Sequence, residues 1–133
     1  MTFLKSITVA ASAVALSAGL AVAGSYGSSD KPVLVAKLGD QTYLVNQDKM
    51  TLYTFDKDGD GVSNCYGDCA VKWPPLVVDA GVNPGAGYSL VTRTDGSLQV
   101  AYHGQPLYTW FKDQNPGDMT GDGVKGVWHV ARP

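Results

Sequence analysis

The sequence contains no glutamate: its 12 acidic side chains are all aspartate. Aspartate favours turns and helix caps, whereas glutamate favours helix interiors, so this absence argues against a helical protein. The 16 glycines and 7 prolines argue in the same direction, because both residues interrupt helices. We therefore expect an all-β fold of short strands and turns with little helix.

The chain also lacks a strong charge and the common catalytic motifs. Its formal net charge is only −2, which gives no reason to expect nucleic acid or an anionic membrane as a partner. The usual nucleophile motifs, phosphate-binding glycine loops and paired zinc-ligand motifs are absent from the sequence. These absences favour a protein that is not an enzyme.

The one long apolar run, residues 7–22, lies at the N-terminus, after Lys5 and before the small residues that end at Ala23. This order is typical of a secretory signal peptide. We expect cleavage near Ala23 and a periplasmic or secreted location in a bacterium. An uncleaved membrane anchor is the alternative. The residue directly after Ala23 is Gly24 and not a cysteine, so we expect no lipid anchor.

One stretch of the chain occurs twice. Segment 52–58 recurs as 107–113, and Trp73 recurs as Trp128, each time at an offset of 55 residues (52 to 107, 73 to 128). The same offset relates two upstream pairs: Asp40 with Asp95, and Val45 with Val100. A fixed offset is the mark of an internal duplication. The expected parts are a signal peptide 1–23, a flexible lead-in 24–32, a first β-repeat 33–78, a linker 79–87 and a second β-repeat 88–133.

Alternating apolar and β-branched residues between turn formers predict short strands in both repeats. The predicted strands are 33–38, 42–46, 50–55 and 76–78 in the first repeat, and 88–94, 97–102, 107–111 and 126–131 in the second. Asp95-Gly96 predicts a two-residue hairpin turn. One helical turn is expected at 70–73, where Pro74 and Pro75 would end it.

The strand period places aromatic side chains on one face of each motif strand. Tyr53 and Phe55 share a face in the first repeat, and Tyr108 and Trp110 share a face in the second. A single three- or four-stranded repeat is marginally stable on its own. We therefore expect two tandem antiparallel β-repeats of about 55 residues that pack through their aromatic faces.

The repeated motif has the form Tyr-x-(Phe/Trp/Tyr)-x-x-Asp, and it resembles that of the bacterial "secreted repeat of unknown function" family of predicted lipoproteins. The motif residues are Tyr53, Phe55, Asp58, Tyr108, Trp110 and Asp113. Segments 63–69, 73–76, 104–108 and 126–128 are also similar to that family. The resemblance covers roughly residues 33–132 and implies export and a small repeated domain. It implies no activity, and the chain departs from the lipoprotein members by lacking the lipidated cysteine.

The only two cysteines are Cys65 and Cys69. An exported protein meets an oxidising compartment, so we expect them to form a disulfide. Residues four apart on a helix have Cβ atoms about 5–6 Å apart, which exceeds the roughly 3.8 Å of a disulfide. The pairing therefore predicts a turn at Gly67. A redox-active or metal-binding thiol pair is the alternative.

The loop after the first motif strand resembles the start of a calcium-binding EF-hand loop. Asp56, Asp58 and Asp60 fall at ligand positions 1, 3 and 5, and Asn64 falls at position 9. The closing position falls on Gly67 instead of a bidentate glutamate. The loop predicts either a polar turn without a cofactor or a weak extracellular calcium site.

The motif carboxylates Asp58 and Asp113 stand just after strands, where such groups commonly accept backbone N–H groups of the next turn. A catalytic carboxylate pair is the alternative. The aromatic residues are expected in the core, with a carbohydrate-binding platform as the alternative. A copper site is the weakest hypothesis, and its ligands would be His103, His129, Met50, Met119 and the cysteines.

The leading hypothesis is an exported, soluble, non-enzymatic β-repeat domain with a binding or structural role at the cell envelope. Its partner would be an envelope protein or a glycan. The second hypothesis is a metal-responsive (calcium or copper) or redox exported protein that uses the Asp-rich loop or the cysteine pair. A small hydrolase is the third, because two motif carboxylates recur.

Overall fold

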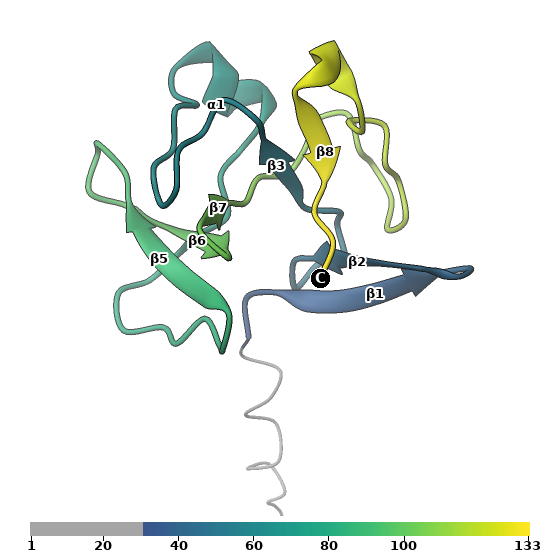
Figure 1. Cartoon of the computed structure of the whole chain (residues 1–133), viewed down its shortest axis with the longest axis horizontal. Helices are drawn as coiled ribbons and strands as arrows, with labels where there is room; N and C mark the ends of the chain where they lie inside the picture. Colours follow the sequence, from purple (N-terminus) through teal and green to yellow (C-terminus); the bar gives the residue numbers. More distant parts are fainter. Residues whose placement is uncertain (1–30) are drawn as a thin grey trace, which may run out of the picture. The chain divides into compact units, whose positions relative to one another are not determined.

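In the computed structural model, the repeated part of the chain folds mainly into short antiparallel strands (Figure 1). The structure describes residues 31–133, so the expected signal peptide 1–23, its cleavage near Ala23 and lead-in residues 24–30 lie outside the described residues. The strands are β1 (Leu34–Leu38), β2 (Gln41–Val45), β3 (Tyr53–Phe55), β4 (Val77–Val78), β5 (Tyr88–Thr92), β6 (Leu98–Tyr102), β7 (Gln105–Pro106) and β8 (Trp128–Val130).

Helical structure within residues 31–133 is limited to the short helix α1 (Asp68–Lys72) and the 3₁₀ turn η3 (Val124–Gly126). Helix α1 begins just before the helical turn expected at 70–73. Neither element has the length and apolar character needed to cross a membrane. The expectation of an all-β fold with little helix is confirmed.

Strand pairing crosses from one repeat to the other. Each repeat keeps its own hairpin, β1 with β2 and β5 with β6. Strand β3 of the first repeat, however, pairs with β8 of the second, and the two lie side by side in Figure 1. Strand β4 of the first repeat pairs with β6 of the second. The end of each repeat therefore completes the sheet of the other.

The backbone hydrogen bonds between the repeats are reciprocal. The Tyr53 N–H donates to the Tyr108 carbonyl at 2.8 Å, and the Tyr108 N–H donates to the Tyr53 carbonyl at 3.0 Å. The Asp56 N–H donates to the Val127 carbonyl at 2.8 Å. Its counterpart 55 residues later is the bond from the Phe111 N–H to the Lys72 carbonyl, at 2.9 Å. Each of the two tandem repeats thus donates the same backbone bonds to the other, as in an approximate two-fold symmetry.

The predicted correspondence of Val45 with Val100 is wrong by one residue. The Leu44 N–H donates to the Ala131 carbonyl, and its counterpart in the second repeat is the bond from the Val100 N–H to the Leu76 carbonyl. Leu44 therefore matches Val100. A one-residue shift moves a side chain to the opposite face of a strand. Accordingly, Val45 lies in the aromatic core cluster and Val100 lies in the aliphatic one.

Turn length explains this shift. In the first hairpin Leu38 pairs directly with Gln41, so the turn has two residues. In the second, the Arg93 N–H donates to the Ser97 carbonyl, so the turn holds three residues, ending at Gly96 with φ 89°. The predicted two-residue turn at Asp95-Gly96, and the pairing of Asp40 with Asp95, are therefore corrected. A three-residue hairpin loop places glycine at this left-handed position.

The second predicted motif strand, 107–111, is also corrected. Tyr108 forms only isolated bridges, and the regular strand nearby is β7. The partner segment here contains Pro74 and Pro75, whereas β3 pairs with the proline-free β8. Proline has no N–H to donate, so a continuous ladder cannot form beside it. The predicted first motif strand 50–55 is shortened to β3.

Two hydrophobic clusters make up the interior. The first is built around the aromatic residues, and the second is aliphatic and includes Leu52 and Leu107. Tyr53 and Phe55 belong to the aromatic cluster, on the side of the strand opposite to Leu52, as the period-two pattern predicts. The expectation that the repeats pack through their aromatic faces is confirmed.

Candidate functional site

Four aromatic rings form a continuous column through the aromatic cluster. Phe55 stacks on Trp128 with ring centroids 4.2 Å apart, and Trp128 stacks on Trp73 at 3.7 Å. Trp73 then packs on Trp110 at 4.0 Å with an interplanar angle of 32°. Each motif aromatic therefore stacks on the tryptophan of the other repeat. We call these four rings the aromatic column.

The motif tyrosines pack edge-on against the centre of the aromatic column. Tyr53 lies 5.4 Å from Trp73 at an interplanar angle of 78°, and Tyr108 lies 5.2 Å from Trp128 at 89°. Both tyrosines are fully buried, and the two tryptophans are at most 4% exposed. These four rings are core residues and not an exposed platform. T-shaped pairs of this kind add stability beyond the area they bury.

The tyrosine hydroxyls and the motif carboxylates are exchanged between the repeats. The Tyr53 hydroxyl donates to Asp113 Oδ2 at 2.6 Å, and the Tyr108 hydroxyl donates to Asp58 Oδ2 at 2.7 Å. Each tyrosine of one repeat therefore bonds the aspartate of the other. The spacing within a single motif gives no sign of this exchange, and sequence reasoning missed it.

The second oxygen of each motif carboxylate accepts from the loop that follows it. Asp58 Oδ1 accepts the Asn64 N–H at 2.7 Å. Asp113 Oδ1 accepts the Thr120 N–H at 3.0 Å and the Thr120 hydroxyl at 2.6 Å. These are the turn contacts that the sequence predicts for the two residues. Each carboxylate is therefore bound to a different loop and a different tyrosine.

Burial shapes the protonation of these groups. Burial raises the pKa of the Tyr53 hydroxyl far above its ordinary value, and the hydrogen bond to Asp113 raises it further. Burial likewise raises the pKa of Tyr108. Burial also raises the pKa of Asp58, although its bonds from Asn64 and Tyr108 oppose this shift. The tyrosines therefore remain protonated donors at neutral pH.

A buried cation supports one of the two tyrosine–aspartate pairs. Arg93 is 5% exposed, and its guanidinium donates to Ser63 Oγ at 3.0 Å, Gln99 Oε1 at 2.8 Å and the Cys65 carbonyl at 2.8 Å. Ser63 Oγ lies 2.5 Å from the Tyr108 hydroxyl. A hydrogen-bonded chain thus links Arg93 to the motif pair. Sequence reasoning missed Arg93, and its only signal was a cation within the predicted strand 88–94.

The two cysteines are joined in a disulfide with an S–S distance of 2.03 Å. Cys65 is buried, and Cys69 lies in helix α1. Between them Gly67 has a positive φ of 61° with ψ −129°, just before the helix begins. This agrees with the predicted turn, because a helix through both cysteines would hold them too far apart. A redox role for the pair stays a prediction.

The structure gives the four predicted calcium ligands separate partners. Asp56 Oδ2 lies 2.8 Å from His129 Nε2 at the surface, and Asp58 bonds Tyr108. The Asn64 side chain donates to the Lys57 carbonyl at 2.8 Å, and the Asp60 carboxylate lies over Gly104. Residues 31–133 contain no group of three or more His, Cys, Asp or Glu side chains placed to hold a metal ion. The calcium hypothesis stays a prediction.

The residues of the copper hypothesis also have separate surroundings. His103 stacks on Tyr102 with ring centroids 4.1 Å apart, and His129 faces Asp56. Met119 packs against the aromatic cluster, and the cysteines are bonded to each other. Copper binding stays untested, and these contacts give it no added support.

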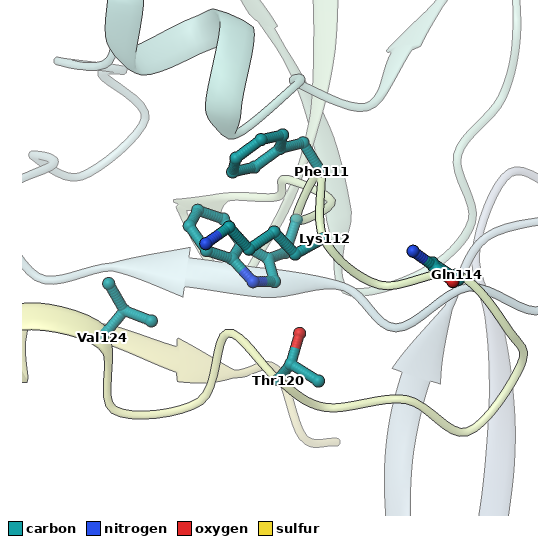
Figure 2. Close-up of a pocket in the computed structure, with 6 residues that line it drawn as sticks. Phe111, Lys112, Gln114, Thr120 and Val124 are labelled. Atoms are coloured by element: carbon teal, nitrogen blue, oxygen red, sulfur yellow. The ribbon is translucent and has the colours of Figure 1, made fainter.

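An open groove of about 920 Å³ lies in the second repeat, beside the outer ring of the aromatic column (Figure 2). Its lining residues are Trp110, Phe111, Lys112, Gln114, Thr120 and Val124. Figure 2 shows Thr120 and Val124 across the groove from Phe111 and Lys112. Phe111 is 50% exposed, and Lys112 Nζ lies 5.7 Å from its ring centroid. The groove thus offers an apolar ring beside a cation.

The groove opens where the first repeat has its disulfide. Asn64 and Thr120 donate the same backbone bond to their motif aspartates, so Gly121 takes the place of Cys65. Val124 is the counterpart of Cys69, because the two residues are separated by the 55-residue offset. The second repeat therefore has no bond to close this end of the aromatic column. Its Phe111 also replaces the charged Asp56 of the first repeat.

A family model described as "Secreted repeat of unknown function" matches two segments of the chain, residues 32–77 and 89–132. The two segments are the two copies that exchange strands and tyrosine hydroxyls. No curated protein and no solved structure gives a significant match.

Gly121→Ala should destabilise the fold through the aromatic column. An added Cβ would lie 2.8 Å from Trp73 and 2.9 Å from Trp110, and these stacked rings have little room to move. We expect a loss of about 2 kcal/mol in the free energy of unfolding, measured by urea denaturation. Gly59→Ala is the matched control, because its Cβ would meet only Val62 at 3.4 Å. Equal losses in the two variants would contradict the prediction.

Asp58→Asn should lower stability, and the deficit should grow as the pH falls. Burial raises the pKa of Asp58 in the folded protein above its unfolded value of 3.8. Protonation of Asp58 therefore stabilises the folded protein. This stabilisation is fully present at a pH below the unfolded pKa and is lost as the pH rises through the folded pKa. Asparagine cannot gain it. At neutral pH we expect a deficit of about 1 kcal/mol from the weakened hydrogen bonds.

The measurement for Asp58→Asn is urea unfolding of both proteins at neutral pH and at a pH of about 4. Asp40→Asn, in an exposed turn, is the control for the loss of one charge. A deficit that shrinks as the solution is acidified would show that the sign of the pKa shift is wrong.

Proposed function

We propose a glycan-binding function at the cell envelope on one premise: the chain belongs to the family of secreted repeats of unknown function. That membership makes it an exported repeat domain. The proposed site is the groove in the second repeat, and the proposed role is binding without catalysis.

The difference between the two ends of the aromatic column carries this proposal. At one end the first repeat has a disulfide and the charged Asp56. At the related end the second repeat has an open groove with Phe111 half exposed. A contiguous apolar surface rimmed by polar residues is a common mark of a binding site, and Trp110, Phe111 and Val124 line this groove together with polar side chains. The duplication thus gives one closed end and one open end.

The chemistry of the groove suits a saccharide chain. The exposed ring of Phe111 offers a face on which the apolar side of a sugar ring can stack. Lys112 and Gln114 add an ammonium group and an amide at the same groove, and both can bond sugar hydroxyls or a sugar carboxylate. An apolar platform with a few convergent polar groups is typical of small-ligand sites.

The motif carboxylates support a binding role over a hydrolytic one. Asp58 and Asp113 both have their oxygens occupied by a tyrosine hydroxyl and by groups of the following loop. A general acid or base needs a position within reach of the substrate. The groove instead uses Lys112, Gln114 and Thr120. The buried Trp73 packs behind Trp110 and supports the ring that lines the groove.

Phe111→Ala should weaken oligosaccharide binding by about tenfold, which corresponds to the loss of one stacking contact. Isothermal titration with soluble peptidoglycan fragments and with a neutral β-linked glucan oligosaccharide measures this. Val35→Ala is the matched control, because Val35 is 58% exposed on β1 in the first repeat, a strand that pairs with β2. The proposal fails if no oligosaccharide binds, or if Phe111→Ala weakens binding no more than Val35→Ala does.

A further inference from the structure

We propose that the aromatic column and the Tyr53–Asp113 pair form a relay for a single oxidising equivalent, which enters at Trp110 and comes to rest on Tyr53. The agent would be an outer-sphere one-electron oxidant acting at the groove surface. This activity is independent of glycan binding, in which the stacking ring is Phe111 and not a ring of the aromatic column.

The rings provide a continuous path from the surface to the interior. Trp110 is partly exposed and lines the groove, and its ring centroid lies 4.0 Å from that of Trp73. Trp73 is 4% exposed, and its centroid lies 5.4 Å from that of the fully buried Tyr53. Electron exchange falls steeply with distance, so rings in contact exchange electrons in preference to more distant ones. Tryptophan and tyrosine are also the aromatic side chains most readily oxidised by one electron.

Trp110 is suited to pass the charge inward. Its indole N–H is buried and has no hydrogen-bond partner in the part of the chain that the structure describes. When an external oxidant removes one electron, the resulting radical cation therefore has no neighbouring protein base to take its proton. The Trp110 radical cation then takes an electron from Trp73, which moves the radical cation to Trp73.

Tyr53 is suited to hold the oxidising equivalent, because its hydroxyl proton can move to Asp113. Its hydroxyl donates to Asp113 Oδ2 at 2.6 Å. When an electron leaves Tyr53 for Trp73, the phenolic proton moves along this bond. The products are a neutral tyrosyl radical and a protonated Asp113, while the oxidant is reduced by one electron. Moving the proton avoids an isolated cation in the interior, which would be costly. An external one-electron reductant reverses each step.

The related Tyr108–Asp58 pair is the poorer resting place. The Tyr108 oxygen lies 2.5 Å from Ser63 Oγ, and Ser63 accepts a bond from the buried Arg93 cation at 3.0 Å. Tyr53 has only the Gly121 N–H at its oxygen, at 3.2 Å. Positive charge connected to a phenol oxygen opposes removal of an electron from that ring. The asymmetry of the two pairs therefore directs the oxidising equivalent to Tyr53.

Laser-flash oxidation of the full chain tests this relay. The probe is a ruthenium(III) polypyridyl complex generated in solution by a sacrificial acceptor, and transient absorption and electron paramagnetic resonance identify the radicals. In the unmodified chain we expect a tryptophan radical that decays as a tyrosyl radical grows, more slowly in D₂O than in H₂O. In Tyr53→Phe the tyrosyl growth should be lost and the tryptophan radical should persist.

Two further variants separate the roles of ring and base. Tyr102→Phe, which removes a hydroxyl outside the aromatic column, and Tyr108→Phe should both keep most of the tyrosyl growth. Asp113→Asn keeps Tyr53 but removes its base, so the growth should be lost; Asp40→Asn is its control. Should Asp113→Asn fail to fold, the D₂O comparison on the unmodified chain still tests whether a proton moves with the electron. Unchanged tyrosyl growth in Tyr53→Phe, or growth without a D₂O effect, would overturn the proposal.

Discussion

The reciprocal pairing of Tyr53 and Tyr108 is the constraint on which the rest of the structure depends. Each tyrosine is fully buried and must find an acceptor for its hydroxyl, since an unpaired buried polar group costs about 1–3 kcal/mol. The acceptor is always the aspartate of the other repeat. Three other contacts also join one repeat to the other: the backbone bridge, the pairing of β3 with β8, and the stacking within the aromatic column. Neither repeat can satisfy its own buried groups alone.

Interlocking of this kind separates the core from the surface that can diverge. The tyrosine–aspartate pairs and the central tryptophans serve both copies, so a change in either copy disturbs both. The loops at the two ends of the aromatic column also bond the other copy, through Arg93 to the Cys65 carbonyl and through the Gly121 N–H to the Tyr53 hydroxyl, but they differ between the copies. One has acquired the Cys65–Cys69 disulfide, and the other has Gly121 and an open groove. The proposed glycan site and the proposed entry point for an oxidant both lie at this second end.

The sequence predicted what depends on local pattern. Spacing within one segment predicts the period-two faces of the motif strands and the cysteine turn at Gly67. The fixed offset between two segments predicts the duplication. The exchange of hydroxyls was not predictable, because the spacing of Tyr53 and Asp58 suggests nothing about a partner in the other copy. The match of Leu44 with Val100 was hidden for a different reason. The turn of the second hairpin is one residue longer than that of the first, and the segment from Val100 to Leu107 is one residue shorter than that from Leu44 to Leu52. The two differences cancel, so the offset is 55 residues before the first difference and after the second.

Native-state amide hydrogen exchange, followed by NMR, tests the interlocked core most directly. The Tyr53 and Tyr108 amides donate to each other's carbonyls, so breaking one bridge should require opening both repeats. We predict that the two amides exchange with the same opening free energy, equal to that of global unfolding. If either amide exchanges at a clearly lower free energy than the other, one repeat opens independently and the account of mutual dependence is wrong.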